Sequence, residues 1–149
     1  MSEVTSSAQR ESAYQVDTLL VQAHGIAAFV TLLIAVVFGI LVSLQFFLPD
    51  FAANVLPTWG RMRYAHTQGI MLGWLGNAFL AFLYHAVPIL TGRPVTSRKL
   101  GLWLFGIWNF AVMLPGWVLV LSGVSQPLEW AEFPLPVDAF VVLGFVLAA

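Results

Sequence analysis

The segment TLLVQAHGIAAFVTLLIAVVFGILVSLQFFLP, residues Thr18–Pro49, contains no formally charged side chain. A helix needs about 20 apolar residues to cross the roughly 30 Å hydrocarbon layer of a membrane, and this segment is longer than that. Two further uncharged stretches, Tyr64–Gly92 and Leu100–Leu128, also exceed this length. The sequence therefore predicts an all-α fold, a polytopic transmembrane helical bundle with three complete spans.

The composition of the 149-residue chain agrees with a membrane environment. Hydrophobic residues make up 60% of the chain and charged residues 9%, whereas soluble domains have about 45–50% and about 25%. We therefore expect an integral membrane protein in contact with lipid. The absence of cysteine excludes disulfides and thiolate metal sites. A net charge of −1 gives no indication of a nucleic-acid partner, so none is expected.

Charged and turn residues divide the chain into segments. A polar tail precedes the first span, and a fourth apolar run after Asp138 has only eleven residues up to Ala149. Because eleven residues are too few to span a membrane, we expect the chain to be the N-terminal part of a longer protein. The predicted divisions are a tail at residues 1–17 and a transmembrane region at 18–149, with helices at about 20–48, 64–91, 100–123 and 138–149, the last one truncated.

The loops predict the orientation of the chain. Gly92–Lys99 carries three positive charges, and the positive-inside rule places such a loop in the cytoplasm. The N-terminus is then cytoplasmic as well, while the loops Pro49–Gly60 and Ser122–Asp138 face outward. Arg61 and Arg63 therefore lie on the side where positive charge does not serve as a topology signal.

His66 begins the second apolar stretch, three residues after Arg63 and five after Arg61. Ionisable groups near hydrocarbon are costly and are usually retained for function. Histidine is a common axial ligand of haem iron, and arginine pairs with carboxylates such as the haem propionates. We therefore expect His66 to bind haem and both arginines to contact its propionates. The alternative is that the arginines reach lipid phosphates.

Small and polar residues follow His66 along one face of the same helix. At 3.6 residues per turn, Gly69, Gly73 and Asn77 fall on a stripe below His66. Such a stripe lets a flat ligand or another helix approach closely. We expect it to face the haem, with Asn77 as a deeper polar contact, and helix packing is the alternative.

Two other histidines are weaker candidates. His85 follows His66 by 19 positions, which is about 28 Å along a helix, so these two cannot ligate one haem. His24 and His85 lie at similar depth in an antiparallel hairpin and offer a second arrangement for a haem near the inner face. The alternative is that backbone groups or water satisfy both rings.

Two separated motifs resemble one protein family. Residues 60–67, GRMRYAHT, and residues 76–78, GNA, are similar to the second helix of the catalytic subunit I of C-family haem-copper oxidases, the cbb-type cytochrome c oxidases. Residues 123–132, GVSQPLEWAE, are similar to the family's Gly-x-x-Gln-x-x-Glu-aromatic-Ala-Glu, and Asp138 matches an acidic residue that opens the next helix. The chain departs from the family's usual pattern at Gln68 and His85.

The resemblance implies a role for several of these residues. It makes His66 an axial ligand of the low-spin haem b, with the trans ligand in a later helix. The high-spin haem b, the copper ion with its histidines and a cross-linked tyrosine are implied to lie outside this chain, so no catalytic residue is expected here and the chain alone is expected to be inactive. Hard carboxylate oxygens suit calcium, and the resemblance implies a calcium ion near Glu129 and Glu132. The alternative is a solvated acidic loop.

The function implied by the resemblance is that of a terminal oxidase of aerobic respiration, which reduces oxygen to water with proton translocation. Its implied setting is the bacterial inner membrane, within a respiratory complex that includes c-type cytochromes and takes electrons from a cytochrome c-like donor. A nitric oxide reductase large subunit is an alternative, because it shares the haem-ligand histidine and the paired glutamates. A non-catalytic haem b carrier or assembly scaffold is an alternative of another class.

Overall fold

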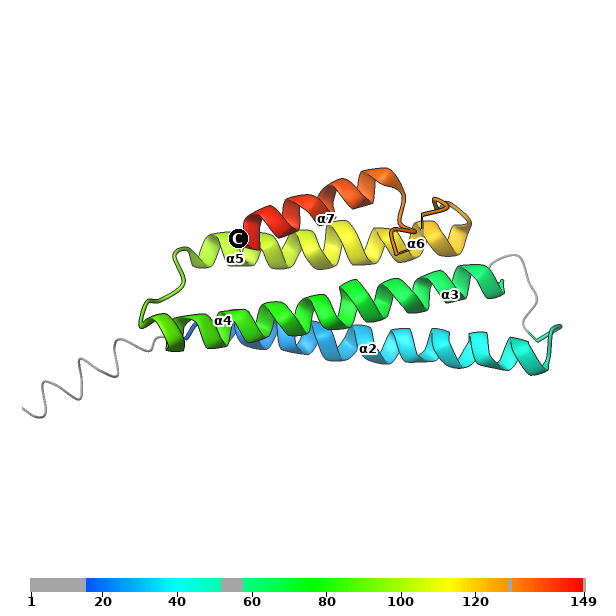
Figure 1. Cartoon of the computed structure of the whole chain (residues 1–149), viewed down its shortest axis with the longest axis horizontal. Helices are drawn as coiled ribbons and strands as arrows, with labels where there is room; N and C mark the ends of the chain where they lie inside the picture. The colour runs from blue at the N-terminus through cyan, green and yellow to red at the C-terminus, as the bar shows by residue number, and fades with distance from the viewer. Residues whose placement is uncertain (1–15, 52–57, 129, 149) are drawn as a thin grey trace, which may run out of the picture.

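The computed structural model describes residues 16–51, 58–128 and 130–148, and within these ranges all regular secondary structure is helical. The helices lie side by side in one elongated bundle (Figure 1). Three helical stretches are long and apolar enough to cross a membrane, namely Thr18–Phe47, Trp59–Thr91 and Arg98–Ser122. The predicted all-α polytopic bundle is therefore confirmed. The predicted N-terminal tail lies outside the described residues except for its last two.

The first span is the uninterrupted helix α2, Thr18–Phe47. Asp17 caps its start, because the Asp17 side chain accepts a hydrogen bond from the Leu20 backbone N–H at 3.2 Å. Although α2 is apolar on all sides, it buries one narrow stripe at helical spacing. The stripe consists of Leu20, His24, Ala28, Thr31 and Ala35.

The second span contains α3, Trp59–Gln68, then a π-helical stretch, η1, Gly69–Gly76, and α4, Asn77–Thr91. It begins at Trp59 rather than near residue 64, so Arg61 and Arg63 belong to its first turns. It ends where Gly92 adopts a left-handed conformation with φ 66°. The Gly92 N–H then donates to Pro88 O at 2.9 Å, which closes the last turn.

The third span has the same composite form. It consists of α5, Arg98–Gly106, the π-helical η2, Ile107–Met113, and α6, Leu114–Ser122. The fourth helix, α7, covers Leu135–Ala148. It starts before Asp138, where the sequence predicted its start, because Pro136 is suited to the first turn of a helix. Asp138 therefore lies within that first turn.

Small residues set the distance between α2 and the second span. A Cβ atom built on Gly69 would lie 2.8 Å from Ala35 Cβ, and one on Gly73 would lie 2.9 Å from Thr31 Cβ. Both distances are too short for real atoms, so these glycines are what permits the close approach of the two helices. Close packing through small residues is the usual way in which membrane helices associate.

Two tryptophans join the second and third spans. Trp108 Nε1–H donates to Leu72 O at 2.8 Å, and Trp117 Nε1–H donates to Ala65 O at 2.9 Å. Buried apolar side chains complete this interface and hold α7 against it. They form one cluster of Val112, Met113, Val120, Phe133 and Val137 and a second of Leu80, Leu104 and Trp108.

Candidate functional site

The ring of His66 is held by the backbone of the neighbouring helix. His66 Nδ1 lies 2.8 Å from Ala35 O in α2. A carbonyl oxygen only accepts, so Nδ1 carries the proton and donates it. The opposite ring nitrogen, Nε2, is then the basic one, which is the form of histidine that binds metals. The geometry at His66 therefore suits an axial haem ligand.

A glycine makes room for this ring. A Cβ atom built on Gly39 would lie 2.8 Å from His66 Cε1 and 2.9 Å from Nδ1. The half-buried His66 lines a shallow groove of about 430 Å³ along α2. The remaining residues of the groove are mostly apolar and all belong to α2: Val36, Gly39, Ile40, Ser43, Leu44 and Phe47.

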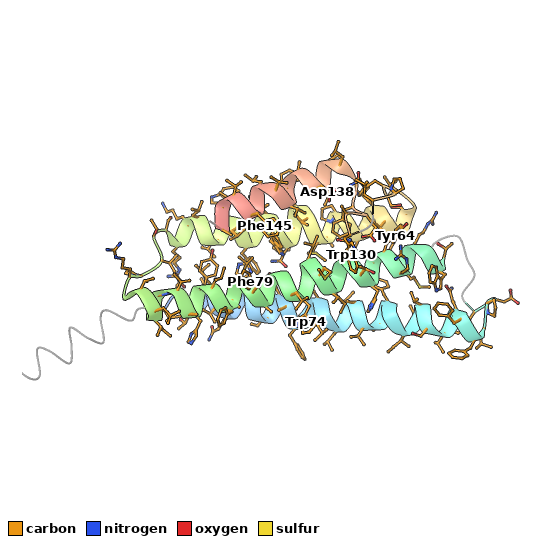
Figure 2. All side chains as sticks on the ribbon, in the orientation of Figure 1. Tyr64, Trp74, Phe79, Trp130, Asp138 and Phe145 are labelled. Carbon is orange, nitrogen blue, oxygen red and sulfur yellow. The ribbon has the colours of Figure 1, made fainter. Side chains whose placement is uncertain are left out.

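The two arginines do not contact the same neighbours. Arg61 Nη1 donates to Leu121 O at 3.3 Å, near the end of α6. The Arg63 guanidinium carbon lies 4.6 Å from the centre of the Tyr64 ring, at the same end of the bundle (Figure 2). On a helix, Arg63 is about 60° from His66 and Arg61 about 140° from it. Arg63 is therefore the arginine that shares the side of His66, and Arg61 faces the third span.

The stripe below His66 contacts protein in this structure. Gly69 and Gly73 lie against α2, as described above. Asn77 is fully buried, and its Nδ2 donates to Gly73 O at 2.8 Å and to Asn109 Oδ1 at 3.0 Å. These contacts correspond to the helix-packing alternative for the stripe.

His24 also belongs to this buried polar group. His24 is fully buried, and its Nδ1 lies 2.8 Å from Asn77 Oδ1, which accepts the hydrogen bond. Asn109 Nδ2 donates to the same Oδ1 at 3.1 Å. The His24 ring stacks on Tyr84 at a centroid distance of 5.6 Å.

The structure does not bring His24 and His85 together. Tyr84 faces His24, and the next position on a helix points about 100° away. The His85 side chain is exposed accordingly. Because His24 is enclosed and His85 points outward, the described residues do not form the inner-face haem site that the sequence left as an alternative.

Glu132 differs from its predicted setting. It was expected on a solvated or calcium-binding acidic loop, but only 1% of its surface is exposed. Gln68, which is equally buried, donates its amide N–H to Glu132 Oε2. Glu132 Oε1 is buried and has no hydrogen-bond partner among the described residues. The alternative prediction, a solvated acidic side chain, is therefore wrong for Glu132.

A second amide side chain, that of Gln126, holds a residue of the segment between α6 and α7 and one in the first turn of α7. Gln126 Nε2–H donates to Asp138 Oδ2 and to Ala131 O, the latter at 2.9 Å. Figure 2 shows Asp138 at the start of α7, where that helix leaves the segment. Glu129 lies outside the described residues. Within the described ranges no group of three histidine, cysteine, aspartate or glutamate side chains is placed to hold a metal ion.

Three of these contacts were not foreseen from the sequence. The sequence marked Gln68 as unusual and Asn77 as a polar residue in need of a partner, but it did not identify Glu132 or Asn109 as the partners. The sequence could have indicated Asn109 as a contact residue, because a lone amide midway along an apolar span must find a hydrogen-bond partner. The sequence gives no indication of the role of Gly39, because that role depends on which residue of another helix lies opposite.

Comparison with known proteins places the chain in a family. Residues 20–149 match the family model described as cytochrome c and quinol oxidase polypeptide I. A cytochrome c oxidase subunit 1 homolog of Agrobacterium tumefaciens is 29% identical over 110 residues, 72% of this chain and 20% of that protein. The cbb3-type cytochrome c oxidase subunit CcoN1 of Stutzerimonas stutzeri is 27% identical over 92 residues, 62% of this chain and 19% of that protein.

A third relative covers more of the chain. A cytochrome c oxidase subunit 1 homolog of Azorhizobium caulinodans is 28% identical over 135 residues, 89% of this chain and 23% of that protein. The chain thus spans about a fifth of the length of these relatives. No solved structure matches it significantly. Since the family model matches nearly all of the chain, the chain belongs to the cytochrome c and quinol oxidase polypeptide I family, the subunit I of haem-copper oxidases.

Proposed function

We propose that this chain contributes to the catalytic subunit of a cbb-type cytochrome c oxidase and that His66 is an axial ligand of its low-spin haem b. The carrying observation is the hydrogen bond from His66 Nδ1 to Ala35 O, which orients the ring and leaves Nε2 for iron. Family membership supports an oxidoreductase of the membrane. The choice of the cbb type rests on the motifs around His66 and on one relative that carries that name.

Different residues of this chain would contact different parts of the haem. His66 would ligate the iron, and Arg63, which shares its side of α3, would pair with a propionate. Arg61 contacts the end of α6 through Leu121 O, so it would join α3 to the third span, and its contact with a propionate stays a prediction. Low-spin haem would supply one-electron transfer. Gly69, Gly73 and Asn77 would support His66 through helix packing.

The acidic residues belong to the same end of the bundle. Glu132 Oε2 is engaged by Gln68, and its buried Oε1 is the atom available to a calcium ion or a proton. Calcium binding by Glu129 and Glu132 stays a prediction. The proposal includes two further cofactors, a copper ion and the high-spin haem b. It also includes partner subunits with c-type cytochromes and a cytochrome c-like electron donor. The proposed location is a bacterial inner membrane, with the N-terminus in the cytoplasm.

Optical spectroscopy of the intact enzyme tests the ligand. His66→Ala should abolish the six-coordinate b-type absorbance, because Nε2 is removed, and the matched His85→Ala should leave it intact, because His85 is exposed. Loss of the spectrum in His24→Ala and His85→Ala, with His66→Ala unaffected, would overturn the assignment. Metal analysis distinguishes an oxidase from a nitric oxide reductase. Copper supports the oxidase, and non-haem iron in place of copper would establish a nitric oxide reductase.

A further inference from the structure

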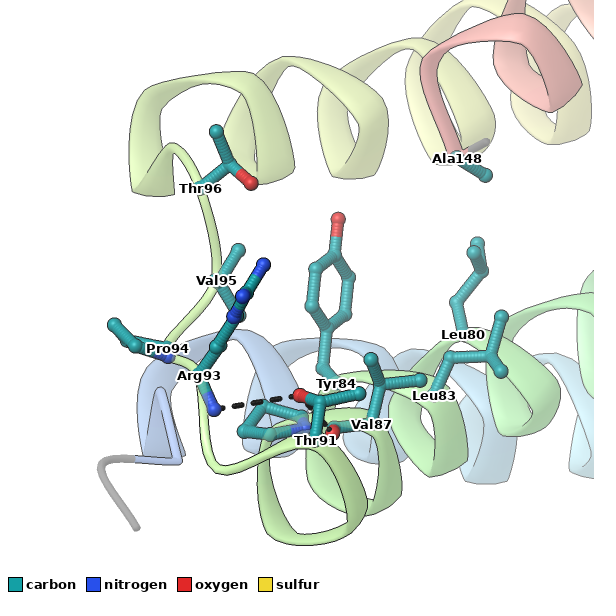
Figure 3. A pocket seen from close by; sticks show the side chains of 11 residues that line it. Leu80, Leu83, Tyr84, Val87, Thr91, Arg93, Pro94, Val95, Thr96 and Ala148 are labelled. Carbon is teal, nitrogen blue, oxygen red and sulfur yellow. Dashed lines mark hydrogen bonds between the residues drawn. The ribbon is translucent and has the colours of Figure 1, made fainter. Parts of the chain in front are cut away.

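A cavity of about 540 Å³ lies at the end of the bundle opposite to Arg61. It is bounded by the last turns of α4, the loop that leads to α5, and the end of α7 (Figure 3). Its volume falls in the range of about 300–1,000 Å³ that is typical of small-molecule sites. Its lining includes Leu80, Leu83, Tyr84, Val87, Thr91 and Arg93.

The polarity of this cavity changes along its length. Leu80, Leu83 and Val87 give it an apolar wall on α4, and Figure 3 shows Arg93 at the loop end. Leu80 and Val87 are separated by seven positions, which is about 10 Å along the helix. The cavity therefore has an apolar wall of roughly 10 Å, with Tyr84 between these positions and the polar Thr91 and Arg93 toward the loop. A free phosphate ion would make no favourable contact with the apolar wall. A lipid matches both parts of the cavity, because it has a charged head and an apolar chain.

The position of Arg93 is defined by the turn that precedes it. Gly92 is left-handed, and the Arg93 N–H donates to Thr91 Oγ1 at 3.3 Å. Thr91 Oγ1–H in turn donates to Val87 O at 2.8 Å. Figure 3 shows these hydrogen bonds as dashed lines. The turn therefore holds Arg93 at the mouth of the cavity.

Among the described residues, positive charges outnumber the one nearby carboxylate, that of Asp17, at this mouth. The single ion pair among the described residues joins Arg98 to Asp17, with an N···O distance of 3.3 Å. Arg93 is exposed and has no carboxylate partner within the described part of the chain. Lys99 adds a further positive charge at the start of α5. An anion is therefore the complementary group at the mouth of the cavity.

We propose that this cavity binds an anionic glycerophospholipid, with Arg93 as the residue that contacts the lipid phosphate. The guanidinium offers paired N–H donors that match a phosphate. An acyl chain lies along Leu80, Leu83 and Val87. The proposal concerns the end of the bundle away from His66 and does not depend on the haem.

Native mass spectrometry of the protein in detergent tests this site, with phosphatidylglycerol as the probe and phosphatidylcholine as the neutral comparison. The wild-type protein should retain phosphatidylglycerol preferentially. Arg93→Gln should weaken that binding by roughly tenfold, because a charge-assisted hydrogen bond is lost. The control Lys99→Gln removes the same charge from a residue that does not line the cavity, and it should change binding less than twofold, an order-of-magnitude bound for a screened surface charge.

A second variant tests the apolar wall. Val87→Trp fills the cavity and should also reduce retention, with circular dichroism showing that the helices persist. Equal losses in Arg93→Gln and Lys99→Gln would reduce the site to a general basic surface and overturn the proposal. Equal retention of the two lipids, unchanged binding in Val87→Trp, or full competition by inorganic phosphate would overturn it as well.

Discussion

Gly39 is the residue on which the geometry of His66 most directly depends. It is a glycine within a helix, where glycine is less stable than alanine by about 1 kcal/mol, so its presence calls for a packing reason. The reason is the His66 ring, which occupies the place of a side chain on Gly39. Gly25 in the same helix has no atom within 4 Å of its Cβ position and serves as a natural comparison.

Gly39→Ala should therefore disturb the proposed haem site while Gly25→Ala does not. The new methyl group would lie 2.8 Å from His66 Cε1 and would displace the ring from Ala35 O. We expect a lower haem content and a shifted b-type absorbance in Gly39→Ala, measured on the purified enzyme. Gly25→Ala should keep the spectrum and be equally or more stable. An unchanged spectrum in Gly39→Ala would contradict the dependence of His66 on this contact.

Gln68 and Glu132 form the second contact that depends on individual residues. Gln68→Leu should lower the free energy of unfolding by about 1–3 kcal/mol, because it leaves the buried Glu132 carboxyl without its amide partner. Glu132→Gln removes the charge and keeps an oxygen acceptor for Gln68, so it should be nearly neutral in protein prepared without calcium. Replacing both residues by leucine should recover most of the loss, since no polar group is left unpaired.

Thermal unfolding in detergent, followed by tryptophan fluorescence, measures these differences. The single and double variants form a cycle that isolates the pair. If Gln68→Leu and the double variant were equally destabilised, the loss would come from packing rather than from the hydrogen bond. Equal stability of all variants would show that Glu132 is solvated in the membrane-bound enzyme.

Among the helices, one polar group connects three elements. His24 of α2 and Asn109 of η2 both donate a hydrogen bond to Oδ1 of Asn77 in α4. The amide groups of Asn77 and Asn109 also bond to each other in both directions. Because hydrocarbon offers no replacement partners, this group favours a single alignment of the three helices.

Asn77→Leu should consequently destabilise the bundle more than an equivalent change on the surface. It leaves His24 Nδ1–H and the Asn109 amide without their partner, at about 1–3 kcal/mol for an unsatisfied buried group. Gln22→Leu is the control, since Gln22 lies exposed on α2. Thermal unfolding of both variants in detergent gives the comparison. Equal midpoints would show that the polar group does not hold the helices in place.

The helices themselves were largely predictable, and their interruptions were not. Length and apolarity are enough to identify a span, because the hydrocarbon layer imposes a minimum length. The π-helical stretches Gly69–Gly76 and Ile107–Met113 have no comparable sequence signal. The start of α3 at Trp59 also differs from the prediction, because Arg61 and Arg63 mark the edge of the apolar segment in the sequence. Long arginine side chains allow a helix to continue beyond the hydrocarbon.

For the molecule as a whole, the distribution of charge predicts how it lies in the membrane. The loop with Arg93, Arg98 and Lys99 should be cytoplasmic. The chain has no cysteine of its own, so no native thiol within it competes with a single introduced cysteine. Pro94→Cys should resist a membrane-impermeant thiol reagent in intact cells and react after lysis, whereas Asp50→Cys should react from outside. The reverse pattern would place His66 toward the cytoplasm and contradict the proposed orientation.

Apolar length and the short motifs around His66 and Glu132 are enough to predict the fold class, the three spans and the family. Which residues meet is seen only in the folded chain. The hydrogen bonds of His66 with Ala35, His24 with Asn77, and Gln68 with Glu132 join positions 31, 53 and 64 residues apart. The first two pairs depend on the relative rotation and depth of two helices, and small-residue packing sets both only once the helices are in contact. The third pair depends on where the segment between α6 and α7 folds back onto α3.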